Sequence, residues 1–515
     1  MKAYFRKNLV LWLTLLVLTI FFVAAARGME TQDWIITLLR GLSVGSVTFL
    51  VASGFSLIFG LLDVLNLAHG TLFMIGAYVA WTVYVRPDTF VDLLAPILLL
   101  VSGFTLSALW MNLSKRIQLK GRAIRIAPWA GLLLSIFIIA YIFPRYPVSV
   151  WDVGNYGQSP VTYSFMASQG LLMLPPGVAF DEISLGVAAI GLLLAGMLAA
   201  FSLSLFEKSG QSGTRLRWQN FVGFAVVLVL GLFTLFANDA ITTFLTEMST
   251  TWLFAISLVV AALSGALLGG LMESTLIRPL YSRPIYQLMM TLGLSAIGIE
   301  VVRAIWGRPE FVMPKPAIFN GTGDGCPATT LAEAFNNQCS TLMVFDGRVR
   351  VYNEIFIPIV GIVVLIAVWV LLKRSRIGMI IRAGVQDREM VEALGINVRR
   401  VFTFVFALGV GLAALGGALA APSMGLSNVM GESLLLNALI ALAIGGLTSY
   451  PGAALGSLLV GLMQQFIIKY GSIGIAIPFT EIIFKPSPPL VPASTVLLMV
   501  IILLILPNGL LGKKE

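Results

Sequence analysis

Long apolar runs recur along almost the whole sequence, and they constrain its fold more than any other feature. A helix needs about 20 mostly apolar residues to cross the hydrocarbon core of a bilayer, and because several runs are short we expect about 11 to 14 spans. The fourteen candidate runs are residues 9–26, 42–62, 70–85, 93–114, 128–143, 183–206, 219–237, 251–271, 287–305, 354–372, 401–421, 433–447, 452–469 and 493–511. They lack the two-residue alternation of a barrel wall, so helices must satisfy the backbone inside lipid. The sequence therefore predicts an all-α polytopic membrane protein, a helical bundle.

The basic residues follow the alternation of these runs. If the loop 373–400 is cytoplasmic, the intervals on its side hold 22 Lys and Arg in 91 residues, and the opposite intervals hold 9 in 156. Basic residues concentrate in cytoplasmic loops, so this orientation is preferred to its inverse, and it places both termini in the cytoplasm. The net charge of +9 is thereby explained without nucleic acid.

Two features concern the outer side of the membrane. Residues 1–26 have the basic start and apolar stretch of a signal peptide, but an ordinary first span fits equally well. Cys326 and Cys339 share the polar loop 306–353, which the charge pattern places outside, where disulfides persist. Either a bridge or two unpaired thiols is compatible with the sequence.

Two apolar stretches are interrupted by polar residues, glycine or proline. The first, LDVLNLAHGTLFMIGAY at 61–77, carries Asp63, Asn66, His69 and Gly70. Broken helices are tolerated in a membrane where they line a cavity, and the freed backbone groups then face a polar solute. A polar turn that only joins two spans is the alternative. The second interruption, AIGGLTSYPGAALGS at 443–457, leaves the same choice open at Gly445, Gly446 and Pro451.

The basic loop 373–400 contains good helix formers from Gln386 to Leu394, followed by Gly395 at the position of a helix stop. Met390 and Leu394 lie four residues apart, on one side of this helix. Its charged residues are Arg388, Glu389 and Glu392. Such a helix fits a groove of a partner protein or the surface of the bilayer.

Ionisable residues near the apolar runs have a simple interpretation. Glu273, Glu300, Arg303 and Glu432 all lie close to predicted ends of spans, so snorkelling or pairing at the interface is favoured over a proton relay. Glu300 and Arg303 have the spacing of a helical ion pair.

Several motifs of enzymes are missing from the sequence. It has no GxxxxGK[ST] loop for ATP, no catalytic triad and no dinucleotide-binding loop. With one histidine in the chain, we expect no metal site. The chain is therefore predicted not to be an enzyme.

Four segments, in order, resemble one family. GLSVGSVTFLVASGFSLIFGLLDVLNLAHGTLFMIGAY, LMESTLIRPLYSRP, RAGVQDREMVEALGINVRRVFTFVFALGVGLAALGGALAAP and GGLTSYPGAALGSLLVGL are similar to the branched-chain amino acid permeases of the LivH type, subunits of ATP-binding-cassette importers of the bacterial inner membrane. The resemblance implies a second related permease, two cytoplasmic ATPase subunits that use ATP, and a periplasmic or extracellular solute-binding protein. No cofactor is expected on this chain. It also implies that residues 386–395 form the coupling helix and that Asn66, His69 and Gly70 lie on the permeation path.

The resemblance covers residues 35–85 and 251–515, leaving 86–250 as an insert with extra spans. We therefore expect a signal-like segment or span at 1–34, a first permease region at 35–85, the insert, and the main permease region at 251–515. The expected function is uptake of branched-chain amino acids or related small solutes, such as urea and short amides, by alternating access. The alternatives are an ion-coupled carrier that uses Asp63, and a passive channel or scaffold.

Overall fold

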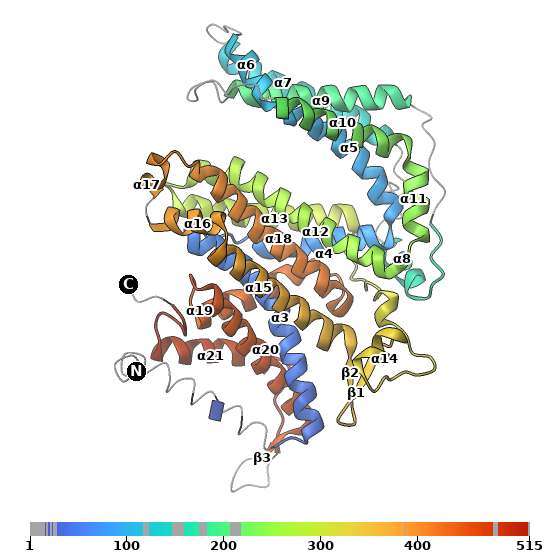
Figure 1. Cartoon of the computed structure of the whole chain (residues 1–515), viewed down its shortest axis with the longest axis vertical. Helices are drawn as coiled ribbons and strands as arrows, with labels where there is room; N and C mark the ends of the chain where they lie inside the picture. Colours follow the sequence, from blue (N-terminus) through green and yellow to red (C-terminus); the bar gives the residue numbers. More distant parts are fainter. Residues whose placement is uncertain are drawn as a thin grey trace. The chain divides into compact units, whose positions relative to one another are not determined.

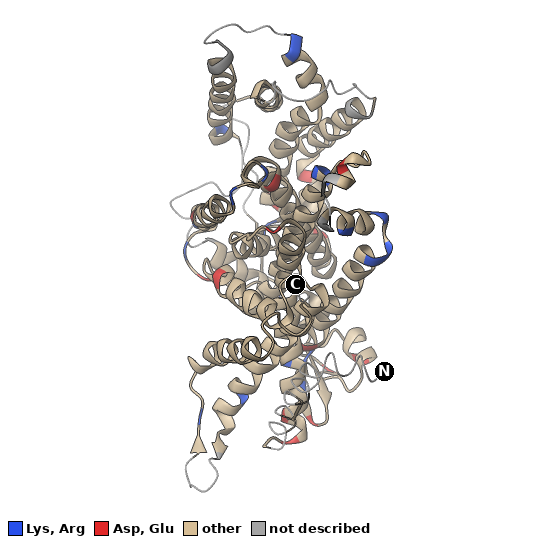
Figure 2. Cartoon of the chain, turned by 90° about the vertical axis from the view of Figure 1, so that its left-hand side faces the viewer, with Lys and Arg blue, Asp and Glu red and all other residues tan. Residues whose placement is uncertain are grey.

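The prediction of an all-α membrane protein is confirmed. The computed structural model describes residues 28–116, 123–146, 159–174, 183–206, 218–386, 388–476 and 483–512, together with residues 16, 19, 20 and 23. Within these ranges nine helices are long and apolar enough to cross a membrane, or ten if one bent pair counts as a span, and two shorter apolar helices occur. Figure 2 shows long stretches of helix without a charged residue. Most of the first predicted run, with its signal-like features, lies outside the described residues.

The chain divides into two compact units. Unit 1 comprises the described parts of residues 1–84, 157–171 and 249–515, and unit 2 those of 85–156 and 172–248. The helices of unit 1, labelled in Figure 1, are α3 (Thr31–Leu62), α4 (His69–Val85), α8 (Ser159–Ser168), α12 (Thr250–Met272), α13 (Pro284–Trp306), α14 (Leu331–Asn336), α15 (Ile357–Arg374), α16 (Arg376–Gln386), α17 (Arg388–Ala393), α18 (Val398–Met424), α19 (Met430–Gly445), α20 (Tyr450–Ile473) and α21 (Leu490–Ile505). Short helical turns of unit 1 are η2 (Glu273–Ile277), η3 (Arg278–Leu280), η4 (Ala317–Phe319) and η5 (Val351–Phe356).

Helices α3 and α18 form the centre of unit 1. The most apolar window of each is 78% buried, against 11% for α13. Small residues let the backbones approach closely: a Cβ on Gly54 of α3 would overlap the carbonyl oxygen of Gly409 in α18, and α20 packs on α3 through Gly45 and Gly461. Helix α12 meets α18 in the same way at Gly265 and Gly269, so these glycines form packing surfaces between helices.

Loops of unit 1 lie near both ends of α3. At the end that we call the α17 end, Leu62 of α3 joins Tyr281, Val391 and Phe402 in one apolar cluster. At the opposite end, Arg40 near the start of α3 pairs with Glu354 at 2.9 Å. The strands β1 (Thr341–Val344) and β2 (Gly347–Arg350) form an antiparallel hairpin there, beside the first turns of α3. We call this the hairpin end.

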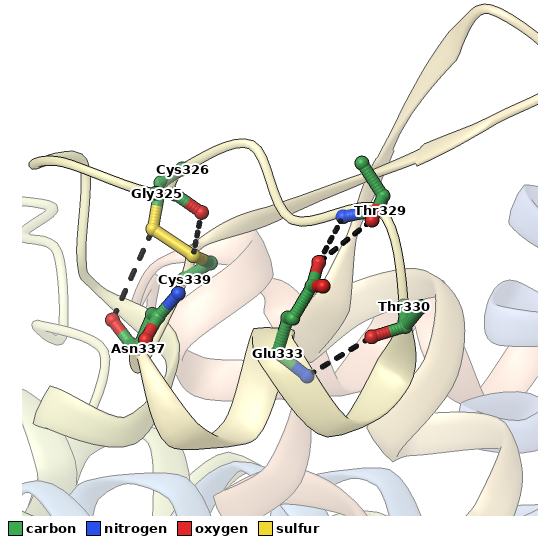
Figure 3. Close-up of a disulfide and its surroundings, with 7 residues drawn as sticks. All are labelled: Gly325, Cys326, Thr329, Thr330, Glu333, Asn337 and Cys339. Atoms are coloured by element: carbon green, nitrogen blue, oxygen red, sulfur yellow. Dashed lines mark hydrogen bonds between the residues drawn. A yellow bond between two sulfur atoms is a disulfide. The ribbon is translucent and has the colours of Figure 1, made fainter.

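A disulfide joins Cys326 and Cys339 in the loop at the hairpin end (Figure 3). It encloses the short helix α14, whose N-cap Thr330 accepts a hydrogen bond from the backbone of Glu333 at 3.2 Å. The Glu333 carboxylate accepts from the hydroxyl and backbone of Thr329, and these hydrogen bonds lower its pKa. The loop is therefore folded by local bonds as well as by its disulfide.

Unit 2 is a bundle built from most of the predicted insert. Its helices are α5 (Pro87–Thr105), α6 (Ser107–Arg116), α7 (Ala123–Ile142), α9 (Leu185–Phe206), α10 (Trp218–Phe236) and α11 (Asn238–Glu247), with the turn η1 (Phe143–Arg145). Helix α9 packs between α5 and α7, and α10 packs on α5. The structure differs from a continuous insert because residues 157–171 return to unit 1, where Ser164 of α8 accepts a 2.8 Å hydrogen bond from Trp81. A second short hairpin, β3 (Ile475–Ala476) with β4 (Ile483–Phe484), follows α20.

Candidate functional site

The first interruption separates α3 from α4. Helix α3 ends at Leu62, and Asp63 adopts a left-handed conformation, with φ 53°. The side chain of Asn66 then accepts from the backbone of Ala68 at 3.1 Å, which starts α4 at His69. Nε2 of His69 lies 3.1 Å from the carbonyl oxygen of Val51, eleven residues before the end of α3, so this side chain lies well back along that helix. Helix α4 therefore begins inside the bundle.

Two polar side chains are enclosed at the start of α4. Asn66 and His69 are both fully buried. Nε2 of His69 lies 3.1 Å from the carbonyl oxygen of Val51, which can only accept, so in a neutral ring Nδ1 is left as an acceptor. Neither this Nδ1 nor Nδ2 of Asn66 has a partner within the described residues. Buried polar atoms normally have partners, so an unpaired acceptor and an unpaired donor here are notable.

The second interruption lies against the last turns of α3. Helix α19 ends at Gly445, Gly446 has φ 106°, and Ser449 caps α20 by accepting from Gly452 at 3.2 Å. Ser56 of α3 donates to the carbonyl of Leu447 in this turn at 3.3 Å. Both interruptions therefore adjoin the same part of α3.

The glycines that the sequence singles out have packing roles in this structure, whereas the proline lies at a helix start. A Cβ on Gly70 would overlap the carbonyl of Gly431 in α19, and one on Gly445 would overlap that of Gly452. Pro451 is exposed in the first turn of α20, where its missing N–H is not needed. Gly70 and Gly445 make the close approach of the broken helices possible.

A cavity of about 230 Å³ adjoins the start of α4. Its wall is mainly apolar and is formed by α4, the end of α12 with η2, and α13. The lining residues are Ala68, Thr71, Leu72, Ile75, Leu268, Leu271, Met272, Thr275, Leu276, Leu294 and Gly298. The position of Ala68 in this wall puts the cavity one residue from His69.

The basic loop folds into two helices instead of the one predicted. Gln386 is the last residue of α16, and α17 runs from Arg388 to Ala393. Gly395 ends it with φ 80°, and the hydrogen bonds from Gly395 to Glu392 and from Ile396 to Val391 form a Schellman motif. Asp387 lies outside the described residues, as do the side chains of 385–389.

One face of α17 is seated on unit 1 and the other is open. Val391 is buried in the cluster with Val398 and Phe402. Met390 and Leu394, predicted to share a side, have exposed fractions of 61% and 73%. An exposed apolar pair on a firmly seated helix is suitable for contact with another protein.

The ionisable residues are paired or at helix ends. Arg303 and Glu300 form the predicted ion pair at 2.6 Å, and Glu432 is exposed in the first turn of α19. Glu273 is paired too, with Arg278, but its side chain is fully buried and not at a surface as snorkelling requires. Asp63, the candidate of the ion-coupled alternative, is exposed.

Sequence reasoning found both interruptions and the cap at Gly395. It missed the amphipathic helix α16, although Ser375, which accepts from the backbone of Gly378 at 2.9 Å, is a recognisable N-cap. It also missed the partners of Glu273 that lie far away in the sequence. No local pattern reveals those.

Comparisons with known proteins agree with this architecture. The family model described as "Branched-chain amino acid transport system / permease component" matches residues 37–236 and 172–506. The high-affinity branched-chain amino acid transport system permease protein LivH of Salmonella typhimurium is 26% identical over 52% of this chain and 77% of its own. BraD of Pseudomonas aeruginosa, named as a permease protein of the same kind of system, is 30% identical over 33% of this chain and 51% of its own. A probable LivH of Methanocaldococcus jannaschii is 24% identical over 42% and 63%.

No solved structure matches the chain. The family model covers well over half of it, including the segments of both broken helices and the basic loop. The chain therefore belongs to the family of permease components of branched-chain amino acid transport systems.

Proposed function

We propose that this chain is the membrane-spanning subunit of an ATP-binding-cassette importer that moves branched-chain amino acids into the cytoplasm of a bacterium. The observation that carries the proposal is the family match over residues 37–236 and 172–506. Bacterial relatives named for branched-chain amino acid transport support the choice of solute. The basic α17 end is the cytoplasmic one in this proposal, and both termini lie in the cytoplasm of a cell with this protein in its inner membrane.

The start of α4 is the proposed solute site. The N-terminus of a helix favours a carboxylate, and Asn66 Nδ2 is a free donor beside it. His69 Nδ1 is a free acceptor for an ammonium group, and the apolar cavity that begins at Ala68 accommodates an aliphatic side chain. Gly70, Gly445, Gly446 and Pro451 shape the broken helices around this path. Because Asn66 and His69 are fully buried, the path is closed in this conformation.

Partner subunits supply the energy. We assign the segment from Gln386 through Arg388, Glu389 and Glu392 to Gly395 to contact with a cytoplasmic ATPase, supported by the exposed pair Met390 and Leu394. The full assembly contains two such ATPases, a second related permease, and a solute-binding protein on the outer face. ATP is bound and hydrolysed by the ATPases, and this chain binds no cofactor.

Residues 86–250 are proposed to be an addition to the permease regions 35–85 and 251–515. The separate packing of unit 2 supports this division. The proposed solute site and α17 do not depend on this addition, because both belong to unit 1.

The test is purification of the tagged chain from membranes of its native host, followed by reconstitution into liposomes. We expect two ATPases and a second permease to co-purify, and uptake of leucine, isoleucine or valine to require ATP and the binding protein. Urea and acetamide are included as competing solutes. Leu394→Glu changes an exposed residue of α17, so it is expected to release the ATPases while the chain stays folded.

Phe345→Glu is the matched control, because Phe345 is 70% exposed at the tip of the β1–β2 hairpin, at the other end of unit 1. It is expected to retain the ATPases. Uptake by the chain alone, driven by an ion gradient, would contradict the proposal. Uptake of urea in place of the amino acids would overturn the assigned solute and leave the importer intact.

A further inference from the structure

The buried carboxylate of Glu273 in unit 1 accepts hydrogen bonds from three different residues. Glu273 follows the last residue of α12 and has no exposed side-chain surface. Its two oxygens accept from Nε and Nη2 of Arg278 at 3.2 and 2.7 Å. The hydroxyl of Tyr281 donates to the same carboxylate at 2.7 Å, and so does the hydroxyl of Thr403, also at 2.7 Å. Charge-assisted bonds of this kind are short and directional.

These partners come from different elements. Glu273 opens the π-helical turn η2, Arg278 opens η3, and Thr403 lies in the second turn of α18. Arg278 also donates to Thr403 at 2.7 Å, which closes the arrangement into a ring of bonds. A single π-helical turn between regular helices frequently marks a functional position. The end of α12 and the start of α18 are thereby fixed to each other.

Tyr281 connects this ring of bonds to the seat of α17. Its hydroxyl is held by Glu273, and its ring packs edge-on against Phe402, with centroids 6.3 Å apart. Phe402 and Val391 belong to the apolar cluster beneath α17, and Leu62 packs against that cluster. Leu62 is the last residue of α3 before the interruption that leads to Asn66 and His69. Apolar contacts alone are not directional, so the hydrogen bonds decide how these elements are oriented.

We propose that Glu273 is a positioning residue for energy coupling: it holds the ends of α12 and α18 and the seat of α17 as one rigid body, so that movement of α17 is passed to the transport helices. This inference rests on the proposed function. Glu273 does not touch the solute. It acts through Tyr281 and Thr403.

The test measures solute moved per ATP hydrolysed in the reconstituted complex. Tyr281→Phe removes only the hydroxyl and leaves the ring on Phe402, and Thr403→Val removes the second hydroxyl. Both are expected to assemble with the ATPases and to hydrolyse ATP, with uptake per ATP at least tenfold lower. Thr403→Ser keeps the hydroxyl and is expected to restore the ratio. Glu300→Gln, in the exposed pair on α13, is the control and leaves the ratio unchanged.

A merely structural role would lower assembly, ATP hydrolysis and uptake together at a constant ratio, and that result overturns the inference. An unchanged ratio in Tyr281→Phe and Thr403→Val overturns it as well. The wild-type preparation distinguishes failure of the proposed function from failure of this inference. If it shows no ATP-driven uptake, the proposed function falls and this inference with it; if it transports normally, only this inference is at stake.

Discussion

Some glycines of unit 1 lie where two backbones meet and others face open space, so the effect of substitution depends on what a methyl group would touch. At Gly54 a Cβ would overlap the carbonyl oxygen of Gly409 and approach Nε2 of His69 to 3.0 Å. At Gly293 of α13 nothing lies within 4 Å of the added atom. Both residues are helical, so the two positions separate packing from helix propensity.

We therefore expect Gly54→Ala to lower the free energy of unfolding by about 1 to 3 kcal/mol, because overpacking forces two central helices apart. Gly293→Ala is expected to raise it by about 0.4 to 1 kcal/mol, since alanine reduces the entropy of the unfolded chain. Thermal unfolding of the purified variants in one detergent measures both. Equal stability of the two variants would show that α3 and α18 do not touch at Gly54.

The same comparison on α13 tests the cavity beside α4. A Cβ on Gly298 would come within 2.6 Å of Cγ2 of Thr71, and both residues line the cavity. Gly298→Ala is therefore expected to raise the KM for leucine and isoleucine several-fold more than that for valine, which is smaller by one methylene worth about 0.8 kcal/mol. Gly293→Ala, one and a half turns away, is expected to leave all three values unchanged. Uptake assays measure the KM for each of the three amino acids. An equal change in all three KM values would show that the cavity is not part of the solute site.

At the level of elements, the sequence predicts a helix end best where one residue type strongly favours the required backbone conformation. Gly395 is predicted to stop a helix because glycine adopts the left-handed conformation of a C-cap most readily, and its φ of 80° agrees. Helix α16 is less apparent because Gly378, Gly384 and three isoleucines weaken its propensity. Burial of Ile381 against α3 and α18 overrides that preference. The depth of His69 was equally hidden, since only tertiary packing determines how far the chain returns along α3.

The cap of α17 gives a prediction for this element. Alanine at Gly395 must adopt φ near 80°, which costs about 1 to 2 kcal/mol in the left-handed region. Gly395→Ala is expected to loosen α17 and to weaken binding of the ATPase about tenfold, the equivalent of about 1.4 kcal/mol. Gly384→Ala lies inside α16 with ordinary contacts to Val398 and Phe402, so it serves as the control and is expected to bind normally. Titration of the purified ATPase onto immobilised chain measures the affinity. Identical affinities would argue against α17 as the contact.

At the level of the whole molecule, composition was sufficient to predict the class of fold. It was not sufficient to predict how the chain divides into two units. Apolar runs of membrane length give spans irrespective of which unit they join, so the sequence predicted the long apolar helices but not the shorter helices α8, α11, α14 and α16. It did not show that α8 leaves the insert to pack on α4, because the bond between Trp81 and Ser164 joins residues that are distant in sequence. Charge alternation, in contrast, sorts loops by side without any knowledge of packing.

Orientation is the prediction that tests this argument over the whole chain. Cys326→Ser and Cys339→Ser give a background without native cysteines, since the sequence contains two. Two single-cysteine variants are then made in this background: Phe345→Cys at the hairpin tip and Leu394→Cys on α17. Both positions are highly exposed. A membrane-impermeant maleimide is expected to label Phe345→Cys in spheroplasts and Leu394→Cys only after the membrane is opened. Equal labelling in opened membranes controls for reactivity. The reverse pattern would invert the chain, place α17 outside, and remove it from reach of any ATPase, so that the basic loop would need another explanation than coupling.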